Sequence, residues 1–432
     1  MRRVEADGAI AQDIEVVRMG AAPPLPPFAW LALVFVSIAN FGGPVADLLV
    51  RNRGFSDTQI GLLNAIYSLP NILLLLVGGW LVDRFGAGRM MAATAVCCLM
   101  GALLTALGPD FRSMAAGRLL FGVGAETFNV ATLAGVVRFF SARYLALAIG
   151  ISLALGRAGA FAVDISPTWL SSAYADGWQS PLLVAAAFAG VSLLASIAYW
   201  QTESSRATPA SVPALRASLY NWHDFARFRT AFWYLFALCV VWYAVVFAFR
   251  STFSITYFQH AHGLDLAAAG AINGYIYLAA LFATPLLGWL SDRTQRPTPL
   301  LAAGCLLLPA SIAVIATNIW PLWVGTILIG TSYSLVPAVL WSLASRLVPE
   351  MRLGVALSFL SVGLNIGIAG ANVAAGQLND RFGAGASNPA GYKPMMLLFF
   401  ALGMLGFIFS LMLWKKCDTK ARRDGSLRRL HT

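Results

Sequence analysis

The chain of 432 residues consists of long apolar stretches separated by short polar ones. Proline, glycine and charge clusters divide it into twelve apolar segments, each close to the roughly 20 residues that a helix needs to cross a bilayer. The segments are 28–50, 57–82, 88–108, 113–139, 144–172, 178–200, 231–258, 265–290, 298–317, 320–346, 353–379 and 392–414. The pattern therefore predicts an all-α membrane protein with twelve transmembrane helices.

The polar stretches predict how the chain is divided. The one long polar interruption lies midway, and its aromatic residues, such as Trp222 and Phe225, stand beside Arg227 and Arg229. That mixture favours a short helix lying in the membrane interface. We expect an N-terminal tail (1–27), a first helix bundle (28–200), this linker (201–230), a second bundle (231–414) and a basic, disordered C-terminal tail (415–432).

Composition excludes several classes of protein. Apolar residues make up 59% and charged residues 11% of the chain, against about 25% charged in soluble domains. The net charge of +11 would suit a nucleic-acid partner, but the basic residues lie between the apolar runs, so no such partner is expected. The five cysteines lack metal-ligand spacing, and no nucleotide-binding or hydrolase motif occurs. We expect neither an enzyme, nor a cofactor, nor a metal site.

The basic residues predict the orientation in the bilayer. With the N-terminus inside, 22 of the 30 Lys and Arg residues fall in cytoplasmic segments and five in outer loops. By the positive-inside rule, both termini are then cytoplasmic. Of the 30, 26 are Arg, a bias that fits a GC-rich bacterium. We therefore expect a multi-pass protein of the bacterial inner membrane, with the lipid bilayer as its surroundings.

A repeated motif relates the two halves of the chain. Gly79 is followed by Asp83-Arg84, and Gly288 by Asp292-Arg293, 209 residues later. Two copies at half-chain spacing, each expected in a short cytoplasmic loop, predict two pseudo-symmetric bundles of six helices. The glycines would permit close helix contact, and the Asp-Arg pairs would latch helix ends in one conformation.

These loops, the twelve helices and the central polar linker resemble the major facilitator superfamily of secondary transporters. The resemblance covers the whole chain. It implies that two bundles rock about a binding site at the middle of the membrane and so carry a small solute by alternating access.

Five ionisable residues fall inside the predicted spans: Arg118, Glu126, Arg157, Asp164 and Arg250. Each would cost at least about 2.5 to 3.5 kcal/mol if it faced lipid at mid-membrane, so each should face protein or water. The fourth and fifth helices are antiparallel, and residues equally far from the turn between them share a depth. This places Glu126 level with Arg157 near the midplane, and Arg118 level with Asp164 further out as a charge pair.

Local segments resemble the lysosomal dipeptide uniporter family more specifically. They are Gly122-Val-Gly124-Ala-Glu126, Gly156-Arg157-Ala-Gly159, and Ser332-Tyr-Ser-Leu followed by Leu340-Trp341. The resemblance implies uniport and a clamp in which Glu126 takes a peptide's ammonium group and Arg157 its carboxylate. Residues matching the family's segments would line the rest of the site, or simply pack the helices: Tyr67, Asn129, Tyr243, Asn273, Tyr277, Trp341 and Asn365.

Three alternatives stay open. Arg157 and Arg250 could instead serve a transporter of organic or inorganic anions. The chain could be a receptor or scaffold with a transporter fold, and its basic tail could bind a protein. The midplane Glu126 could couple transport to protons. An accessory protein subunit is also compatible with the sequence.

Overall fold

The computed structural model describes residues 26–140, 142–204, 228–293, 297–349 and 352–429. Over these ranges the chain is helical, and the one β-bridge joins Gly385 to Asn388 in a loop. The expected N-terminal tail up to residue 25 and most of the linker, with its expected interfacial helix, lie outside the described residues.

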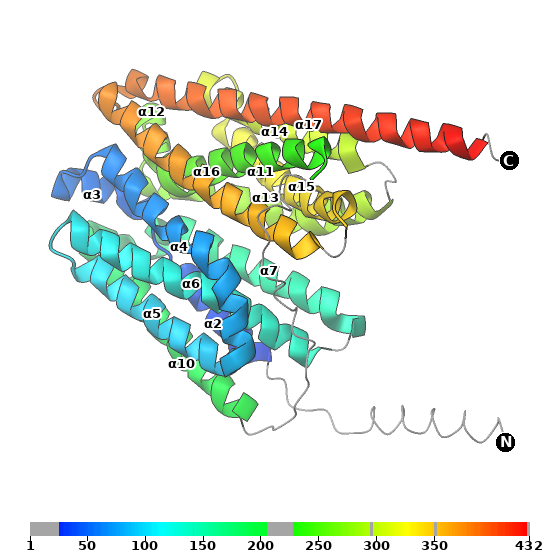
Figure 1. Ribbon diagram of the computed structural model, residues 1–432. Helices are drawn as coiled ribbons and strands as arrows, with labels where there is room; N and C mark the ends of the chain where they lie inside the picture. Colours follow the sequence, from blue (N-terminus) through cyan, green and yellow to red (C-terminus); the bar gives the residue numbers. More distant parts are fainter. Residues whose placement is uncertain (1–25, 141, 205–227, 294–296, 350–351, 430–432) are drawn as a thin grey trace.

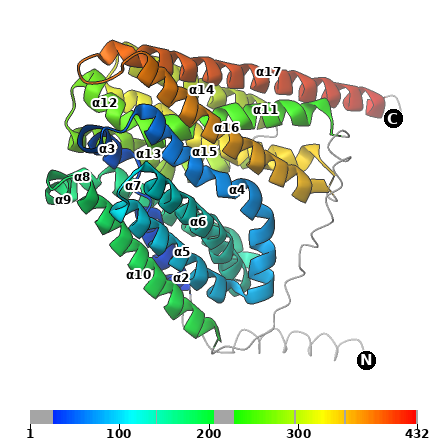
Figure 2. The same ribbon diagram turned by 60° about the vertical axis from the view of Figure 1, so that its left-hand side comes forward.

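The first half of the chain forms one bundle (Figures 1 and 2). Its elements are α2 (Pro26–Ile38), η1 (Gly43–Val45), α3 (Ala46–Arg53), α4 (Asp57–Phe85), α5 (Ala87–Leu107), α6 (Phe111–Phe139), α7 (Ala142–Asp164), α8 (Ser166–Trp169), α9 (Ser171–Ala175) and α10 (Gln179–Ser204). Polar caps start two of the long helices. Ser56 and Gln59 form a capping box on α4, and Asp110 accepts the Ser113 N–H on α6. The latter bond lowers the pKa of the exposed Asp110 carboxyl.

The second half forms the other bundle, which lies above the first in Figure 1. Its elements are α11 (Thr230–Ala248), η3 (Phe249–Phe253), α12 (Ser254–His262), α13 (Leu266–Arg293), α14 (Pro297–Thr317), α15 (Leu322–Leu347), α16 (Leu353–Arg381), η5 (Pro389–Tyr392) and α17 (Lys393–Arg429). Each half has its own buried apolar core, the larger one in the second half. The two halves are thus separate packing units.

The helices match the predicted segments closely, with four differences. The fifth predicted span, 144–172, ends as one helix at Asp164, and the short helices α8 and α9 follow it. The first predicted span breaks at Gly42-Gly43-Pro44, because two glycines and a proline interrupt helical hydrogen bonding. The seventh contains a turn of π-helix, η3. The C-terminal tail, expected to be disordered, instead continues α17 as a helix to Arg429.

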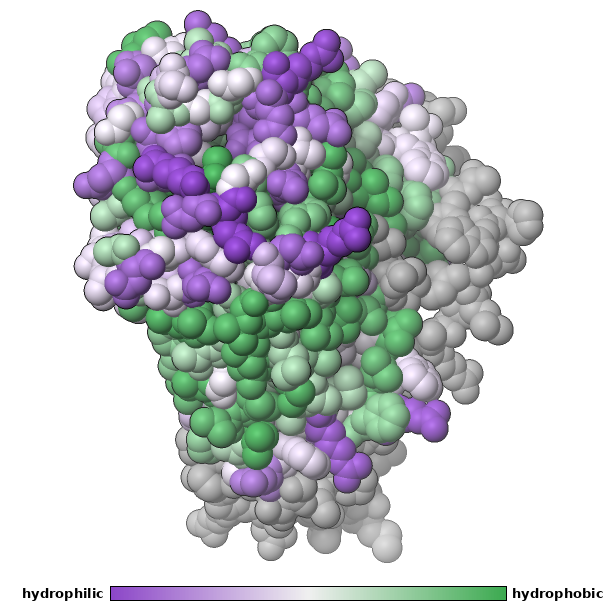
Figure 3. Space-filling view, turned by 90° about the vertical axis from the view of Figure 1, so that its left-hand side faces the viewer, coloured by the Kyte–Doolittle hydropathy of each residue, from purple (hydrophilic) through white to green (hydrophobic). Residues whose placement is uncertain are grey.

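Much of the molecular surface is apolar. Eleven helices among the described residues are long and apolar enough to cross a membrane, and α4 corresponds to the remaining predicted span. Large side chains such as Leu147, Leu194 and Phe282 are more than 60% exposed, which suits contact with acyl chains rather than water. Figure 3 shows hydrophobic residues over a broad area of one face, below a region where polar residues gather.

The two bundles meet most closely where α4 packs against α16 and α7 against α13 (Figure 2). At one end of the molecule, Asp380 of α16 accepts the backbone N–H groups of Asp57 and Thr58 at 2.8 and 2.9 Å. We call this the contact end. A Cβ on Gly61 of α4 would overlap the carbonyl oxygen of Asn372 in α16, so only glycine permits this approach.

Candidate functional site

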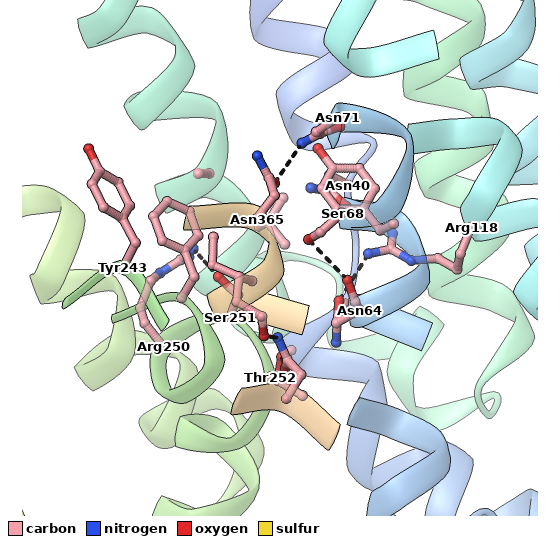
Figure 4. Close-up of a pocket in the computed structure, with 18 of the residues that line it drawn as sticks. Asn40, Asn64, Ser68, Asn71, Arg118, Tyr243, Arg250, Ser251, Thr252 and Asn365 are labelled. Atoms are coloured by element: carbon pink, nitrogen blue, oxygen red, sulfur yellow. Dashed lines mark hydrogen bonds between the residues drawn. The ribbon is translucent and has the colours of Figure 1, made fainter. Parts of the chain in front are cut away.

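A cavity of about 360 Å³ lies between the two bundles (Figure 4), and this volume is within the range of small-molecule sites. Residues of both bundles line it, from α2, η1, α4, α6 and α7 on one side and from α11, η3, α13 and α16 on the other. Four of the lining residues are charged: Arg118, Glu126, Asp164 and Arg250. Their formal charges sum to zero.

Arg250 and Asp164 neutralise each other across the bundle interface. Nη2 of Arg250 lies 2.7 Å from Oδ2 of Asp164, and both side chains are almost fully buried. Nη1 donates to the Tyr277 hydroxyl at 2.6 Å, and the guanidinium lies 3.8 Å from the Tyr277 ring centroid. Asn273 and Ser254 both donate to the Arg250 carbonyl oxygen in η3. These two hydrogen bonds therefore fix the backbone of the π-helical turn at Arg250.

Arg118 has a different kind of environment. Its Nη1 donates to Oδ1 of Asn40 at 2.8 Å, and its Nη2 donates to Oδ1 of Asn64 at 3.0 Å. The guanidinium lies 4.9 Å from the centroid of the Tyr67 ring. Among the described residues, no carboxylate lies within ion-pair distance of Arg118. Its positive charge is held by amide oxygens and a ring face alone.

Glu126 is the corresponding uncompensated acid. No Lys, Arg or His of the described residues forms an ion pair with it. The Asn71 side chain lies beside it, and Nδ2 of Asn71 donates to Oδ1 of Asn365 at 3.1 Å. The last contact joins α4 to α16, and Figure 4 shows it at one edge of the site.

Arg157 does not line this cavity. Its Nη1 donates to the Ala280 carbonyl oxygen at 3.2 Å and to the Thr284 hydroxyl, both on α13. Its guanidinium also lies 5.3 Å from the Tyr333 ring centroid. In this conformation Arg157 therefore links α7 of one bundle to α13 of the other.

Five of the nine expected binding residues line the cavity: Tyr67, Glu126, Tyr243, Tyr277 and Asn365. Asn273 is fully buried behind it and holds η3. Trp341 does not line the cavity but contacts a residue that does, because its Nε1 donates to the Tyr243 hydroxyl at 3.1 Å. Asn129 is exposed on α6 and away from the cavity.

The predicted Arg118–Asp164 charge pair is wrong for this conformation. Asp164 pairs with Arg250, and Arg118 with two asparagines. Glu126 and Arg157, also predicted to be level, form no ion pair either. The depth argument concerns only position along the helices and does not say which way a side chain faces. Because α6 packs chiefly on α5 and α4 and little on α7, residues of α6 and α7 at one height need not face each other.

The repeated motif lies in helices rather than loops. Gly79, Asp83 and Arg84 belong to the last turns of α4, and Gly288, Asp292 and Arg293 to those of α13. No atom of the described residues lies within 4 Å of a Cβ built on Gly79 or Gly288. The close helix contact expected at these glycines is therefore not made in this conformation.

Sequence reasoning missed the amide and hydroxyl lining. Asn40, Asn64, Ser68, Asn71 and Thr252 all face the cavity. In the sequence they can be recognised in the same way as the charged residues, because each is a polar residue inside an apolar span. The sequence analysis named uncharged polar residues only where they match the family's segments, as Asn365 does, and these five residues were not among them.

Comparison with known proteins places the fold in a family. The family model of the Major Facilitator Superfamily matches residues 29–371 and, a second time, residues 247–429. The chain belongs to the Major Facilitator Superfamily. The prediction of an all-α membrane protein of two six-helix bundles is confirmed, and the chain is a secondary transporter of small molecules rather than an enzyme.

Relatives within this superfamily differ in what they carry. The lysosomal dipeptide transporter MFSD1 of Bos taurus is 29% identical over 349 residues, which cover 77% of this chain and 74% of the relative. The probable nitrate/nitrite transporter NarK2 of Mycobacterium tuberculosis is 28% identical over 301 residues, or 66% of this chain and 71% of the relative. A solved D-xylose-proton symporter shares the fold, with a TM-score of 0.72, 14% identity, and 90% and 96% of the two chains covered.

Proposed function

We propose that this transporter carries small zwitterionic peptides, above all dipeptides, with Glu126 binding the amino end. The observation that carries the proposal is that Glu126 faces the cavity between the bundles without a basic partner among the described residues. Glu126 is partly buried, and a carboxylate removed from water is costly unless a cation pairs with it. A peptide ammonium group can supply that cation. The similarity to MFSD1 supports the same substrate class.

The charge balance of the cavity favours a zwitterion over an anion. Asp164 already neutralises Arg250, so Arg250 attracts a free anion only weakly. This leaves one uncompensated cation, Arg118, and one uncompensated anion, Glu126. A solute with one charge of each sign compensates both, whereas an anion compensates Arg118 but is repelled by Glu126.

The similarity to NarK2 keeps a nitrate-like anion as the second candidate. It requires Arg250 to leave Asp164 when substrate enters, because only then would two cations face the cavity. Competition between nitrate and dipeptides for binding separates the two candidates.

We also propose that the protein works as a uniporter in the bacterial inner membrane with both termini cytoplasmic. The resemblance to the dipeptide uniporter family supports uniport. The basic residues support the position of the termini, because with the N-terminus inside 22 of the 30 fall in cytoplasmic segments. The contact end then faces outward. A protonophore should leave dipeptide flux unchanged, and reporter fusions to the C-terminus should report a cytoplasmic location.

The test is the thermal stabilisation of the purified protein by defined solutes, because a ligand that binds the folded state raises its melting temperature. Free dipeptides should stabilise the wild type, and N-acetylated dipeptides should not. Glu126→Gln should lose the response, while Asp176→Asn, which changes an exposed carboxylate, should keep it. Stabilisation by nitrate or dicarboxylates alone would overturn the proposal.

A further inference from the structure

A second and larger cavity, of about 840 Å³, lies in the second bundle at the contact end. Residues of α12, α14, η5 and α17 and of the loops beside them line it, and α14 packs along α17 (Figures 1 and 2). It shares no lining residue with the cavity between the bundles. It is therefore a separate place where a molecule can bind.

The polar and apolar parts of this cavity lie at different depths. Its imidazole, amide and amine groups stand at helix ends, because His262 ends α12, Asn318 follows α14 and Lys393 begins α17. Apolar residues continue the wall along α14 and α17 away from these ends. On α17 they reach Phe400, seven residues or about 10 Å of helix axis beyond Lys393. This order suits a molecule with a polar head and an apolar chain.

The apolar part of the cavity is open toward the bilayer. Leu397 of α17 is 66% exposed, and Ala316 of α14 is exposed as well. Both helices are long and apolar enough to cross the membrane, so their exposed side chains face acyl chains. In the proposed orientation a molecule that enters from this side comes from the outer leaflet.

The charge of the cavity favours an anionic molecule. Lys393 supplies a positive charge, and no aspartate or glutamate is among the described residues that line the cavity. The positive end of the α17 helix dipole lies at the same place. Lys393 is also one of only five basic residues expected in outer loops, where the positive-inside rule does not call for them.

We propose that this cavity binds an anionic diacyl phospholipid, with its headgroup beside Lys393 and an acyl chain along α14 and α17. The proposal goes beyond dipeptide transport and does not depend on which solute the protein carries.

Tyr392 connects the lipid site to the contact between the bundles. It lines the cavity, and its hydroxyl lies 2.7 Å from Nδ1 of His260. Nε2 of the same imidazole lies 2.9 Å from Oδ1 of Asp47 in the first bundle, and both side chains are less than 10% exposed. A lipid that packs against Tyr392 thus stabilises this link and favours a closed contact end.

Native mass spectrometry of the purified full-length protein tests the site. Dioleoyl phosphatidylglycerol should bind about five-fold more tightly than dioleoyl phosphatidylcholine, as expected for one lysine beside an anionic headgroup. In Lys393→Gln the two affinities should become equal. Arg112→Gln, which removes an exposed basic residue outside the cavity, is the matched control and should keep the preference.

The acyl chain has its own test. Ala316→Trp fills the apolar part of the cavity and should weaken the binding of both lipids, whereas glycerol 3-phosphate, a headgroup without chains, should not compete. A preference that survives in Lys393→Gln, wild-type affinities in Ala316→Trp, or competition by glycerol 3-phosphate would each overturn the proposal. None of these results affects dipeptide transport, because the residues lie outside the central cavity.

Spin labels at the exposed residues Asn52 and Ser387 test the link to the contact end. In lipid nanodiscs, phosphatidylglycerol should increase the population with the short distance relative to phosphatidylcholine. Tyr392→Phe lacks the hydroxyl that contacts His260 and should remove this difference. Equal distance distributions in the two lipids for wild type, or a difference that persists in Tyr392→Phe, would refute the role of Tyr392.

Discussion

Arg250 of the second bundle and Asp164 of the first form an ion pair, with 2.7 Å between Nη2 and Oδ2. The pair does two things at once. It removes one cation and one anion from the charge balance of the cavity, and it joins the bundles near the cavity. Arg118 and Glu126 then remain as the cavity's charges without an ion-pair partner among the described residues.

Breaking that pair should be costly. Asp164→Asn or Arg250→Gln alone leaves a buried charge without its partner, and we expect each to cost about 3 to 5 kcal/mol of stability. The double variant should lose less than the sum of the two, because neither charge is then stranded. Thermal unfolding of the purified variants measures this.

Arg51→Gln serves as the control for that cycle. It removes the exposed member of the Arg51–Asp47 pair, whose arginine is 57% exposed, and should cost no more than about 1 kcal/mol. Single variants at Asp164 or Arg250 that melt like Arg51→Gln would contradict this interpretation.

The contact end should depend on Asp380. Its carboxylate accepts two backbone N–H groups at the start of α4, and an asparagine makes weaker bonds there because it carries no charge. Asp380→Asn should therefore favour the conformation that is open at this end. A cysteine introduced at the cavity residue Ser68, with the five native cysteines replaced, should then react about 10-fold or more faster with an impermeant maleimide from that side.

Asp176→Asn, at the same end, is the control and should leave labelling unchanged. Labelling of Ser68→Cys at the wild-type rate in the Asp380→Asn background would show that the carboxylate does not hold this end together.

Two glycines of α4 should respond oppositely to enlargement. In Gly61→Leu the side chain would meet the Asn372 backbone, so the bundles must separate at the contact end. In Gly79→Leu the side chain enters open space and should leave this conformation unchanged. We propose that it instead blocks the alternate one, in which Gly79 and Asp83 would engage their latch, and so slows transport.

Spin labels at Asn52 and Ser387, which are both exposed at this end, measure the separation. The distance should lengthen in Gly61→Leu and match wild type in Gly79→Leu. Equal distances in the two variants would argue against the packing described for Gly61.

The spans could be predicted from sequence because bilayer thickness fixes the length of an apolar helix. The residues Gly42-Gly43-Pro44 indicate the break after α2, because glycine and proline disfavour a continuous helix. No comparable residue marks η3, where Asn273 of α13 donates a tertiary hydrogen bond to the Arg250 carbonyl oxygen. Such bonds join segments that the sequence does not show to be neighbours.

The site was predictable in kind and less so in detail. Four of the five intramembrane charges, Arg118, Glu126, Asp164 and Arg250, line the cavity. Their pairing depended on which face of each helix meets which neighbour, and depth along the helix does not determine that. Arg157 illustrates the point, because it was predicted to be level with Glu126 but bonds to α13.

We propose that this transporter carries zwitterionic dipeptides with Glu126 as the ammonium partner. Counterflow in proteoliposomes tests this proposal most directly, with labelled L-alanyl-L-alanine outside and unlabelled solute inside. Vesicles loaded with the same dipeptide should accumulate label, vesicles loaded with its N-acetyl derivative or with nitrate should not, and Glu126→Gln should abolish the exchange. Accumulation driven by nitrate, or dipeptide exchange that survives in Glu126→Gln, would contradict the account.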